Sequence, residues 1–538
     1  MNKFLSTLFA TISVFISFSQ ITINSQQTIG GTGGELMESY FYDSQGNKYI
    51  IGASNSDISF DKTENSRGDN DIWMVKFDVN NNILWDKTIG GSDYDGIVNA
   101  IIVNDTVFIA SSSYSNISGE KAMNNFGLGD IWMLALDLDG NILWQESYGG
   151  DAEEGFPELV SLPNGNLLLS CSSKSGHSGN KVTDNIGFAD LWLVELNPLD
   201  GVIIQQESVG SIKEEYLIST IISPQQTIIL MGTSREGVSG DKTDAGYGSD
   251  DIWIVELDLN FNVLMDKCFG GDGAENTNFG SITFDDEYYY IAGTSSSGAS
   301  GNKTEPLFSN GGWIPYSDFW LIKTDHSFNV VWDKVYGGHQ EDNCVSVTLN
   351  DWNKLVLSGA SKSGVSGNKT EASYGDYDAW IVIVDKNNGD IIGQDSFGGS
   401  GSEGGLIFPS TTNPQELKML ASSSSAPSGN KTTPHYGDGD AWVLSLDASD
   451  FLNVQTIVDE ISVVAHPNPF NEELHLIFES LKEEVVLKFY SADGKLLSSS
   501  VLEVGANSFD CRFEYASSVI YYEMQGETIF SRGKVVKM

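Results

Sequence analysis

Short apolar runs alternate with polar, turn-forming segments along most of the chain. In the first complete copy of this pattern, the apolar positions predict four strands, at 38–43, 48–53, 72–78 and 83–89. Clusters of Gly, Asn, Asp and Ser separate the runs and are typical of turns. The sequence has no long stretch with a 3.6-residue apolar period, so we expect few helices.

The pattern recurs about every 60 residues. An aspartate two residues before a tryptophan marks the copies, at Asp71 and Trp73, Asp130 and Trp132, Asp190 and Trp192, Asp251 and Trp253, Asp318 and Trp320, Asp378 and Trp380, and Asp440 and Trp442. A lysine precedes each tryptophan, at Lys62, Lys121, Lys181, Lys242, Lys303, Lys369 and Lys431. Most copies end in a glycine pair, as at Gly90-Gly91. A fixed period indicates that one supersecondary unit is copied and packs against its neighbours.

Four short antiparallel strands per copy predict the blade of a β-propeller. The third strand is apolar on both sides, as Ile72, Trp73, Met74 and Val75 show, so its sheet is covered on both faces. Blades packed face to face around a ring satisfy this condition. A two-layer sandwich, which leaves one face of each sheet in solvent, does not.

The two ends of the repeat region complement each other. Residues 26–31 match the end of a fourth strand, whereas 441–446 form a third strand with no glycine pair after it. We therefore predict seven blades, the last built from both ends of the region, so that no sheet edge stays exposed. In the alternative closure, 450–458 supply the last strand.

Composition narrows the possible partners. The chain has 538 residues, 40% of them apolar, and a formal net charge of -45. Such a charge argues against binding to nucleic acid or to anionic membrane surfaces, and is typical of a solvated surface that resists aggregation. The four cysteines, Cys171, Cys268, Cys344 and Cys511, do not follow the repeat, so we expect buried thiols rather than a disulfide framework.

The N-terminal residues 1–19 are typical of a secretory signal peptide. Lys3 gives a positive start, an apolar run follows from Phe4 to Phe18, and Ser17-Phe18-Ser19 forms a small-x-small cleavage site before Gln20. Spanning a bilayer takes about 20 apolar residues, and this run is shorter. We expect export to the periplasm or beyond, and no transmembrane segment.

In this strand order, the long loops between second and third strands share a face with the connections between blades. That face collects the repeat lysines and aspartates and the acids after the glycine pairs, among them Asp93, Asp95, Glu153, Glu154, Glu275, Glu341 and Glu403. Loops on a rigid scaffold often bind ligands. Because these residues recur in every copy, however, we interpret the aspartates as caps of loop amides or partners of the lysines, and the tryptophans as blade packing.

A ligand site should instead break the repeat. The fifth copy has six additional residues within 305–316, and this segment carries Phe308, Trp313 and Tyr316. Exposed aromatic rings suit stacking on sugars or contact with a protein. The alternative is a loop that folds back on its own blade.

Signals for cofactors and catalysis are weak. Gly-Asp strings at 68–71 and 437–440 could bind Ca²⁺ but lack the spaced ligands of a known loop, so we expect no cofactor. The Asn-Lys-Thr triplets match the N-glycosylation sequon, and we interpret them as turn chemistry. The six histidines do not cluster in the sequence, and no hydrolase motif is found. A glycosidase needs only two well-placed carboxylates, so a hydrolase stays possible.

Two family resemblances add to this interpretation. The segment from Gly337-Gly338 through 358–363 resembles bacterial β-propeller repeats, in which a glycine pair and acids lead into a Gly-containing strand and a Ser-rich loop. This resemblance covers about 425 residues. It implies the propeller and no activity.

The C-terminal part looks like the type A sorting domain of the type IX secretion system. The resemblance rests on three motifs, at 465–471, 485–497 and 534–538, with the signal residues Pro467, Asn468, Pro469, Phe470, Asp493, Gly494, Lys495, Lys534, Val535, Val536 and Lys537. Near the final strands this chain has Val519-Ile520-Tyr521 where the family has Gly-x-Tyr. The family implies passage across the outer membrane, usual removal of the domain, and release or attachment to the cell surface.

Alternating apolar residues at 473–478 and 485–490, with an Asp-Gly turn at 493–494, independently predict a small β-sandwich. An ordinary carbohydrate-binding or fibronectin-like module is the alternative. The expected fold is thus all-β, a seven-bladed β-propeller followed by a small Ig-like β-sandwich. The expected parts are a signal peptide (1–19), the propeller (20–450), a linker (451–460) and the sorting domain (461–538).

The sequence therefore favours a secreted or cell-surface propeller that binds an unknown glycan or protein, with the type IX secretion machinery as its export partner. The alternative function is a polysaccharide-degrading hydrolase or lyase whose carboxylates lie on the loop face.

Overall fold

The computed structural model describes residues 20–235, 237–275, 280–308, 316–350, 352–410, 413, 415–452, 459–460, 463–466, 473–478, 480–481, 484–491, 496–512, 518–525 and 529–537. The chain divides into two compact units, one ending at Leu452 and the other beginning at Asn453. Within the described residues no helix is long and apolar enough to cross a membrane.

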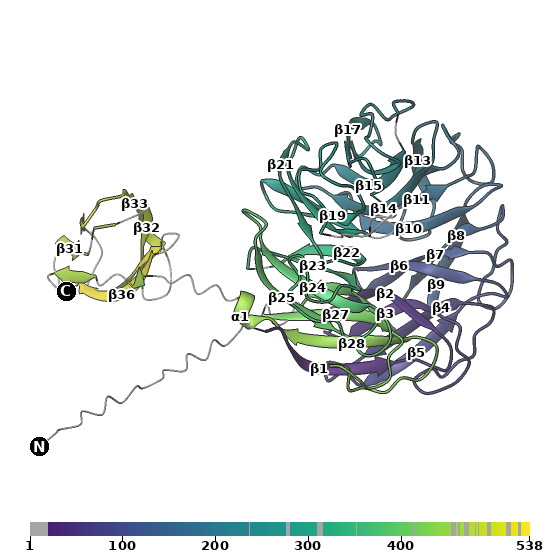
Figure 1. Cartoon of the computed structure of the whole chain (residues 1–538), viewed down its shortest axis with the longest axis horizontal. Helices are drawn as coiled ribbons and strands as arrows, with labels where there is room; N and C mark the ends of the chain where they lie inside the picture. Colours follow the sequence, from purple (N-terminus) through teal and green to yellow (C-terminus); the bar gives the residue numbers. More distant parts are fainter. Residues whose placement is uncertain are drawn as a thin grey trace, which may run out of the picture. The chain divides into compact units, whose positions relative to one another are not determined.

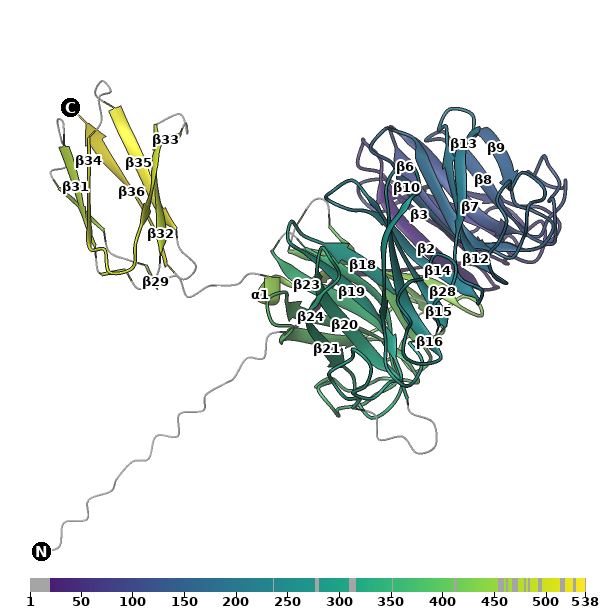
Figure 2. The same cartoon turned by 90° about the horizontal axis from the view of Figure 1, so that it is seen from above.

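In the described part of the first unit, 28 strands form seven four-stranded antiparallel sheets (Figures 1 and 2). The first three sheets are β2 (Glu35–Tyr42), β3 (Lys48–Ser54), β4 (Asp71–Phe77) and β5 (Ile83–Ile89); β6 (Asp95–Val103), β7 (Thr106–Ser113), β8 (Asp130–Leu136) and β9 (Ile142–Tyr148); and β10 (Glu154–Ser161), β11 (Leu167–Ser173), β12 (Asp190–Leu196) and β13 (Ile203–Val209). The next two are β14 (Glu215–Ile222), β15 (Ile228–Arg235), β16 (Asp250–Leu257) and β17 (Val263–Phe269); and β18 (Ser281–Phe284), β19 (Tyr288–Ser295), β20 (Asp318–Asp325) and β21 (Val330–Tyr336). The last two are β22 (Asp342–Leu349), β23 (Lys354–Ser361), β24 (Asp378–Asp385) and β25 (Ile391–Phe397); and β26 (Glu403–Pro409), β27 (Glu416–Ser423), β28 (Asp440–Asp447) and β1 (Thr22–Ile29).

The sheets follow one another around a ring, which makes the unit propeller-like. The first strand of each sheet packs against the first strand of the next, from β2 through β6, β10, β14, β18 and β22 to β26. The ring returns to its start because β2 also packs against β27 and β28. These first strands lie toward the centre in Figure 1, and the fourth strands lie toward the outside.

The N-terminal strand completes the seventh sheet, as the sequence predicted. β1 pairs antiparallel with β28, so that Thr28 lies opposite Trp442 and Ile29 opposite Ala441. The alternative closure by 450–458 is wrong, because β1 occupies that edge and Ser449–Leu452 form the short helix α1. Residues 453–458 lie outside the described residues.

Apolar clusters between adjacent sheets hold the ring together. All seven residues of β4 are buried, and the same holds for β8 and β12. One cluster joins Ile51 and Met74 of the first sheet to Ile109 and Leu134 of the second. Third strands are therefore apolar on both sides because they contact a sheet on each face.

Bulges explain where the predicted strand limits fail. β5 has the predicted bounds, but β2 begins at Glu35 rather than at residue 38. Its pairing with β3 shifts between Met37 and Ser39, and the first strands β6, β10, β14 and β22 have equivalent irregularities. A bulge interrupts the two-residue alternation from which the sequence predicts a strand.

The second unit contains two sheets around one apolar core (Figure 2). One sheet has the order β29 (Asp459–Glu460), β36 (Ile529–Lys537), β35 (Ser518–Gln525), β32 (Val485–Ser491) and β33 (Leu496–Leu502), and the other has β30 (Val464–His466), β31 (Glu473–Ile477) and β34 (Ser508–Arg512). Leu474 and Leu476 of β31 meet Leu487 and Phe489 of β32 in this core.

Part of the predicted sorting signal lies in the last strand. Within β36, Val535 is buried in the core and Lys534 is exposed, whereas Val536 is half-buried and Lys537 is buried. The predicted residues Pro467, Asn468, Pro469, Phe470, Asp493, Gly494 and Lys495 lie outside the described residues, as does the predicted signal peptide at 1–19.

All four cysteines are free thiols, as expected. Cys171, Cys268 and Cys344 are buried in the first unit, and Cys511 is half-buried in the second.

Candidate functional site

The loops between second and third strands are joined to the preceding sheet by hydrogen bonds. The Asn368 amide donates to the Gly337 carbonyl at 3.1 Å, and the Asn368 side chain accepts from Gly337 N and donates to the Val335 carbonyl, both at 2.9 Å. The same backbone bond recurs from Asp61, Glu120, Asn180, Asp241, Asn302 and Asn430 to the residues Gly30, Gly90, Gly149, Gly210, Gly270 and Gly398. Every loop of this face is thus fixed on two adjacent sheets. The side chains of the sequon asparagines Asn302, Asn368 and Asn430 each accept a hydrogen bond from a glycine amide of the preceding sheet, so they stabilise the turn as we expected.

The repeat aspartates cap loop amides. Asp378 Oδ2 accepts from Tyr374 N at 2.5 Å, and Asp130 Oδ2 accepts from Phe126 N at 2.7 Å. All seven of these aspartates are fully buried. Burial raises the pKa of Asp71 and Asp378, and it raises the pKa of Asp130, Asp190 and Asp251 to about 6. Of the two predicted roles, capping is the one the structure shows.

The repeat lysines lie beside the tryptophans in the interior. Lys369 Nζ lies 5.2 Å from the centre of the Trp380 ring and 2.5 Å from Ser361 Oγ. Six of the seven lysines lie over their tryptophan in this way, at Lys62, Lys121, Lys181, Lys303, Lys369 and Lys431. Burial lowers the pKa of Lys62, Lys121 and Lys369 to about 8.

Several acids that the sequence placed on the loop face are interior. Glu154 accepts from Gly150 N at 3.0 Å and from Ser173 Oγ at 2.7 Å, and it is buried. Its equivalents are Glu35, Asp95, Glu215, Glu275, Asp342 and Glu403, all buried. Asp93 is exposed, and Glu153 and Glu341 are half-buried. Asp95, Glu154, Glu275 and Glu403 therefore lie in the interior at the loop face, where they bind amides and hydroxyls.

Each tryptophan also has an acceptor that sequence reasoning missed. Trp320 Nε1 donates to Asp333 Oδ2 at 3.0 Å, and the same carboxylate accepts from Thr304 N at 3.0 Å. The acceptors in the other copies are Asp86, Gln145, Gln206, Asp266, Gln394 and Gln26. An Asp or Gln 13 or 14 residues after the tryptophan was the available signal in six copies. In the seventh copy the acceptor is Gln26 of β1.

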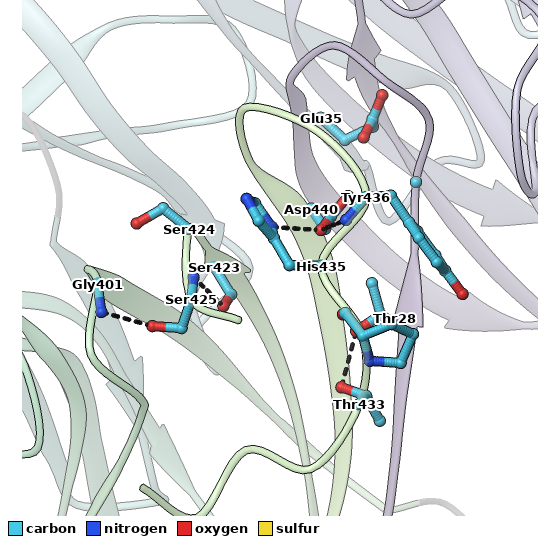
Figure 3. A network of polar contacts seen from close by, with 12 residues as sticks. Thr28, Glu35, Gly401, Ser423, Ser424, Ser425, Thr433, His435, Tyr436 and Asp440 are labelled. Carbon is cyan, nitrogen blue, oxygen red and sulfur yellow. Dashed lines mark hydrogen bonds and ion pairs between the residues drawn. The ribbon is translucent and has the colours of Figure 1, made fainter. Parts of the chain in front are cut away.

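The loop of the seventh sheet differs from the others. His435 Nδ1 lies 2.7 Å from Asp440 Oδ2, which also accepts from Tyr436 N at 2.8 Å (Figure 3). Thr28 of β1 reaches Thr433 of the same loop at 2.7 Å. The Tyr436 ring stacks on Phe60 of the first sheet, with ring centres 4.3 Å apart. This loop therefore contacts β1 within its own sheet and also contacts the loop of the first sheet.

Of the three predicted ligand residues, the structure describes Phe308 and Tyr316. Phe308 N donates to Asp318 Oδ2 at 2.7 Å, as Phe126 N does to Asp130, so Phe308 occupies a position that every copy has. The extra residues lie between Phe308 and Asp318. Tyr316 is exposed, and Trp313 lies outside the described residues.

Aliphatic side chains are displayed around the loop face. Four of these side chains come one residue before the serine of a Ser-x-x-Lys turn. They are 60–67% exposed and belong to Ile58, Ile117, Val238 and Val365. They belong to the first, second, fourth and sixth sheets, and their backbones are fixed by the bonds described above. Loops on a rigid scaffold commonly carry binding residues, so these four positions are candidates for contact with a protein.

Two glutamates near the ring axis form the second candidate site. Glu38 of β2 accepts from Val98 N at 2.6 Å, and Glu158 of β10 accepts from Asn99 Nδ2 at 3.3 Å. Burial raises the pKa of Glu38 to about 7. Burial and the charge of Glu38 raise the pKa of Glu158 to about 8. Coupled carboxyls that titrate near neutral pH can act as proton donor and acceptor. Among the described residues, no group of three or more His, Cys, Asp or Glu is placed to hold a metal ion.

Raising the pH from 5 to 8 is expected to lower the unfolding temperature. Glu38, Glu158 and Asp130 have folded-state pKa values above their ordinary values, so the folded chain holds their protons more tightly than the unfolded chain. This stabilisation is fully present below the ordinary pKa of about 4 and is lost as the pH rises through 6 to 8. Calorimetric scans at pH 5, 6, 7 and 8 measure the decline.

Glu158→Gln is the matched control, because glutamine mimics the protonated carboxyl. The variant is expected to unfold at a higher temperature than the wild type at pH 8 and to show a shallower decline. An unfolding temperature that rises from pH 5 to 8 would contradict the assignment.

Comparisons with known proteins give no family. No protein-family model matches the chain, and no curated protein matches it. Solved structures that it resembles include a Dyadobacter fermentans protein of unknown function, at 9% identity over 80% of this chain and 100% of that one, with a TM-score of 0.39. A Kuenenia stuttgartiensis hydrazine synthase has 10% identity over 71% of this chain and 91% of that one, with a TM-score of 0.39. An apocarotenoid oxygenase of Synechocystis has 9% identity over 92% of this chain and 98% of that one, with a TM-score of 0.38. TM-scores this low support no inference about function.

Proposed function

We propose that the chain is a secreted or cell-surface binding protein, a seven-bladed β-propeller that recognises another protein through its loop face. The seven successive sheets and the closure by β1 support the blade count. In this proposal residues 1–19 are removed on export, 20–450 form the propeller, 451–460 are a linker, and 461–538 form an Ig-like sorting domain. No cofactor is required.

The observation that carries the binding role is the set of exposed aliphatic residues on fixed loops. Ile58, Ile117, Val238 and Val365 occupy the same position in four of the seven loops, and all four are exposed. Their loops lose little conformational entropy on binding, because hydrogen bonds to the preceding sheet already hold them. Aliphatic groups favour a protein ligand over a glycan, since sugar rings stack on flat aromatic faces.

The binding face can be tested with two matched double variants of the full chain. Ile117→Asp with Val238→Asp changes the loop face. Val79→Asp with Leu199→Asp changes two hairpins between third and fourth strands, β4 to β5 and β12 to β13, which we call the hairpin face and where both residues are also exposed. Each pair adds two negative charges. Immobilised wild-type chain is incubated with proteins from the surface and medium of the producing bacterium and, in parallel, with a glycan panel.

We expect one or a few proteins to be retained by the wild type and by the hairpin-face variant, and to be lost by about tenfold or more from the loop-face variant. Equal retention by both variants would contradict the assignment of the face. Retention of glycans and not of proteins would contradict the proposed ligand class.

Export by the type IX secretion system is the second part of the proposal. It is supported by the motif at 534–538, by the two-sheet architecture of the C-terminal unit and by its apolar core. Deleting 461–538 should leave the protein in the periplasm, as measured by fractionation of the producing bacterium. Undiminished surface display of the truncated protein would contradict it.

A polysaccharide hydrolase or lyase is the second candidate function. The coupled carboxyls of Glu38 and Glu158 favour it, although they lie on first strands near the ring axis rather than on the loop face. The pKa of both carboxyls is raised, and a raised pKa is what a general acid requires.

A further inference from the structure

Two lysines break the repeat at buried positions of the second strands. In every sheet the repeat tryptophan pairs with one residue of the second strand, and this residue serves as a reference position for aligning the copies. It is Gly52 in the first sheet and Ala421 in the seventh. Four residues before that point the first sheet has Lys48, where the other sheets have the buried residues Val107, Leu167, Ile228, Tyr289, Leu355 and Leu417. Three residues before it the seventh sheet has Lys418, where the other sheets have the buried residues Tyr49, Phe108, Leu168, Ile229, Tyr290 and Val356.

Both lysines face the interface between the seventh and the first sheet, which we call the seam. Leu167, the equivalent of Lys48, packs against the preceding sheet with Phe108. Leu168, next to it and equivalent to Lys418, packs against the following sheet with Leu217. Neighbouring residues of a strand point to opposite faces, so Lys48 points to the seventh sheet and Lys418 points to the first.

The seam contains a cavity of about 260 Å³ that both lysines line. Ser25, Gln26 and Ser445 of the seventh sheet and Tyr40 of the first also line it. Space is left because Ser25 lies opposite Ser445. In five other sheets the residue equivalent to Ser25 is large, namely Trp85, Trp144, Gln205, Met265 and Trp332. The sixth sheet has Gly393 there, and the Phe451 ring lies beside it.

Of the two lysines, Lys48 has no carboxylate partner among the described residues. Lys418 Nζ is 2.6 Å from Glu416 Oε2, so that lysine is neutralised. Lys48 Nζ donates to Asn81 Oδ1 at 2.8 Å, a neutral acceptor, and lies 4.1 Å from the centre of the Phe77 ring. Burial and the charge of Lys418 lower the pKa of Lys48 to about 8, so it is largely protonated at neutral pH. A buried cation of this kind is costly unless an anion accompanies it.

We propose that the seam cavity binds a small organic carboxylate about the size of one sugar acid, with Lys48 as its principal charged contact. Ser25 and Lys418 line the cavity and can supply further donors, whereas the Ser445 hydroxyl already donates to Glu416 and the Gln26 amide to the Asn430 carbonyl. The volume corresponds to roughly eight waters, which exceeds the size of a bare inorganic ion and is too small for an oligosaccharide. The site is independent of the loop face, so its failure leaves the proposed function unaffected.

Calorimetric titration of the full chain with glucuronate tests the proposal, with glucose as the neutral probe and inorganic phosphate as the small anion. We expect glucuronate to bind at pH 7 and to raise the unfolding temperature, glucose to do neither, and phosphate to bind more weakly than glucuronate. Binding should weaken between pH 7 and pH 9.5 as Lys48 loses its proton. The other titratable groups that face it are Lys418, Glu416, Tyr40 and Tyr42, and burial raises the pKa of both tyrosines, so they stay neutral.

Lys48→Leu restores the residue type of the other copies and should fold. We expect it to bind glucuronate about tenfold more weakly or worse, the loss typical of one charge-assisted hydrogen bond. Lys354→Leu is the control, since Lys354 lies in the sixth sheet beside Asp385 at 3.0 Å and its loss should leave binding unchanged. Equal binding of glucose, unchanged binding by Lys48→Leu, or phosphate binding without glucuronate binding would each overturn the proposal.

Discussion

Deletion of residues 20–29 is expected to abolish cooperative folding of the first unit. The deletion removes β1, and with it the ladder that pairs Ile29 with Ala441 and Thr28 with Trp442. It also removes Gln26, which accepts from Trp442 Nε1 at 3.2 Å and from Thr432 N at 2.8 Å. Each buried group left without a partner costs about 1–3 kcal/mol. Several such losses together with an open sheet edge approach the whole stability of a typical domain, about 5–15 kcal/mol.

Thermal unfolding followed by circular dichroism measures this effect. A synthetic peptide covering 20–31 should restore the transition when added to the truncated chain, because it can pair with β28 in trans. Gln26→Ala is the milder control, with an expected loss of about 1 kcal/mol. A truncated chain that unfolds at the wild-type temperature without the peptide would contradict closure by β1.

Trp132→Ala should lower the free energy of unfolding by about 3–5 kcal/mol. The Trp132 side chain is fully buried, and its Nε1 donates to Gln145 Oε1 at 3.1 Å. Lys121 Nζ lies 5.5 Å from the centre of the ring. Truncation leaves a cavity between two sheets and removes the ring beside a buried cation.

Urea denaturation compares this variant with Trp132→Phe. Phenylalanine keeps most of the ring volume and loses the N–H donor, so we expect a cost of about 1–3 kcal/mol. If alanine costs no more than phenylalanine, the tryptophan does not have the packing role that its burial indicates.

Much of the first unit could be predicted from the sequence because the repeat is regular. The aspartate and tryptophan of each copy define a register, and 26–31 and 441–446 then complement each other as parts of one sheet. β5 has the predicted bounds for the same reason. Strand limits failed where a bulge interrupts the alternation, as between Met37 and Ser39.

The polar interior could not be predicted in the same way. Glu154 follows a glycine pair in a segment that looks like a loop, yet it is buried because Gly150 N and Ser173 Oγ satisfy its carboxylate. Acceptors for the tryptophans lie on the next strand in six copies, so their fixed spacing in the sequence could be interpreted only once the strand pairing was known. Phe308 looked like part of an irregular loop, and only its bond to Asp318 shows that it occupies a repeated position.

The seam shows what the aligned copies reveal and what depends on the three-dimensional structure. Lys48 and Lys418 stand out once the copies are aligned on the tryptophan, so the sequence contains the signal. That the two lysines meet depends on the closure by β1 and on the direction in which each second strand presents its side chains. Neither follows from composition or period.

The proposed function is binding of a ligand without catalysis of a reaction. An activity assay on polysaccharides tests this proposal most directly. The full chain is incubated with a panel of neutral and acidic polysaccharides, and new reducing ends and unsaturated products are measured against a Glu38→Gln, Glu158→Gln double variant. We predict no product from either protein. Product formed by the wild type and absent from the double variant would contradict the claim and establish the two glutamates as catalytic.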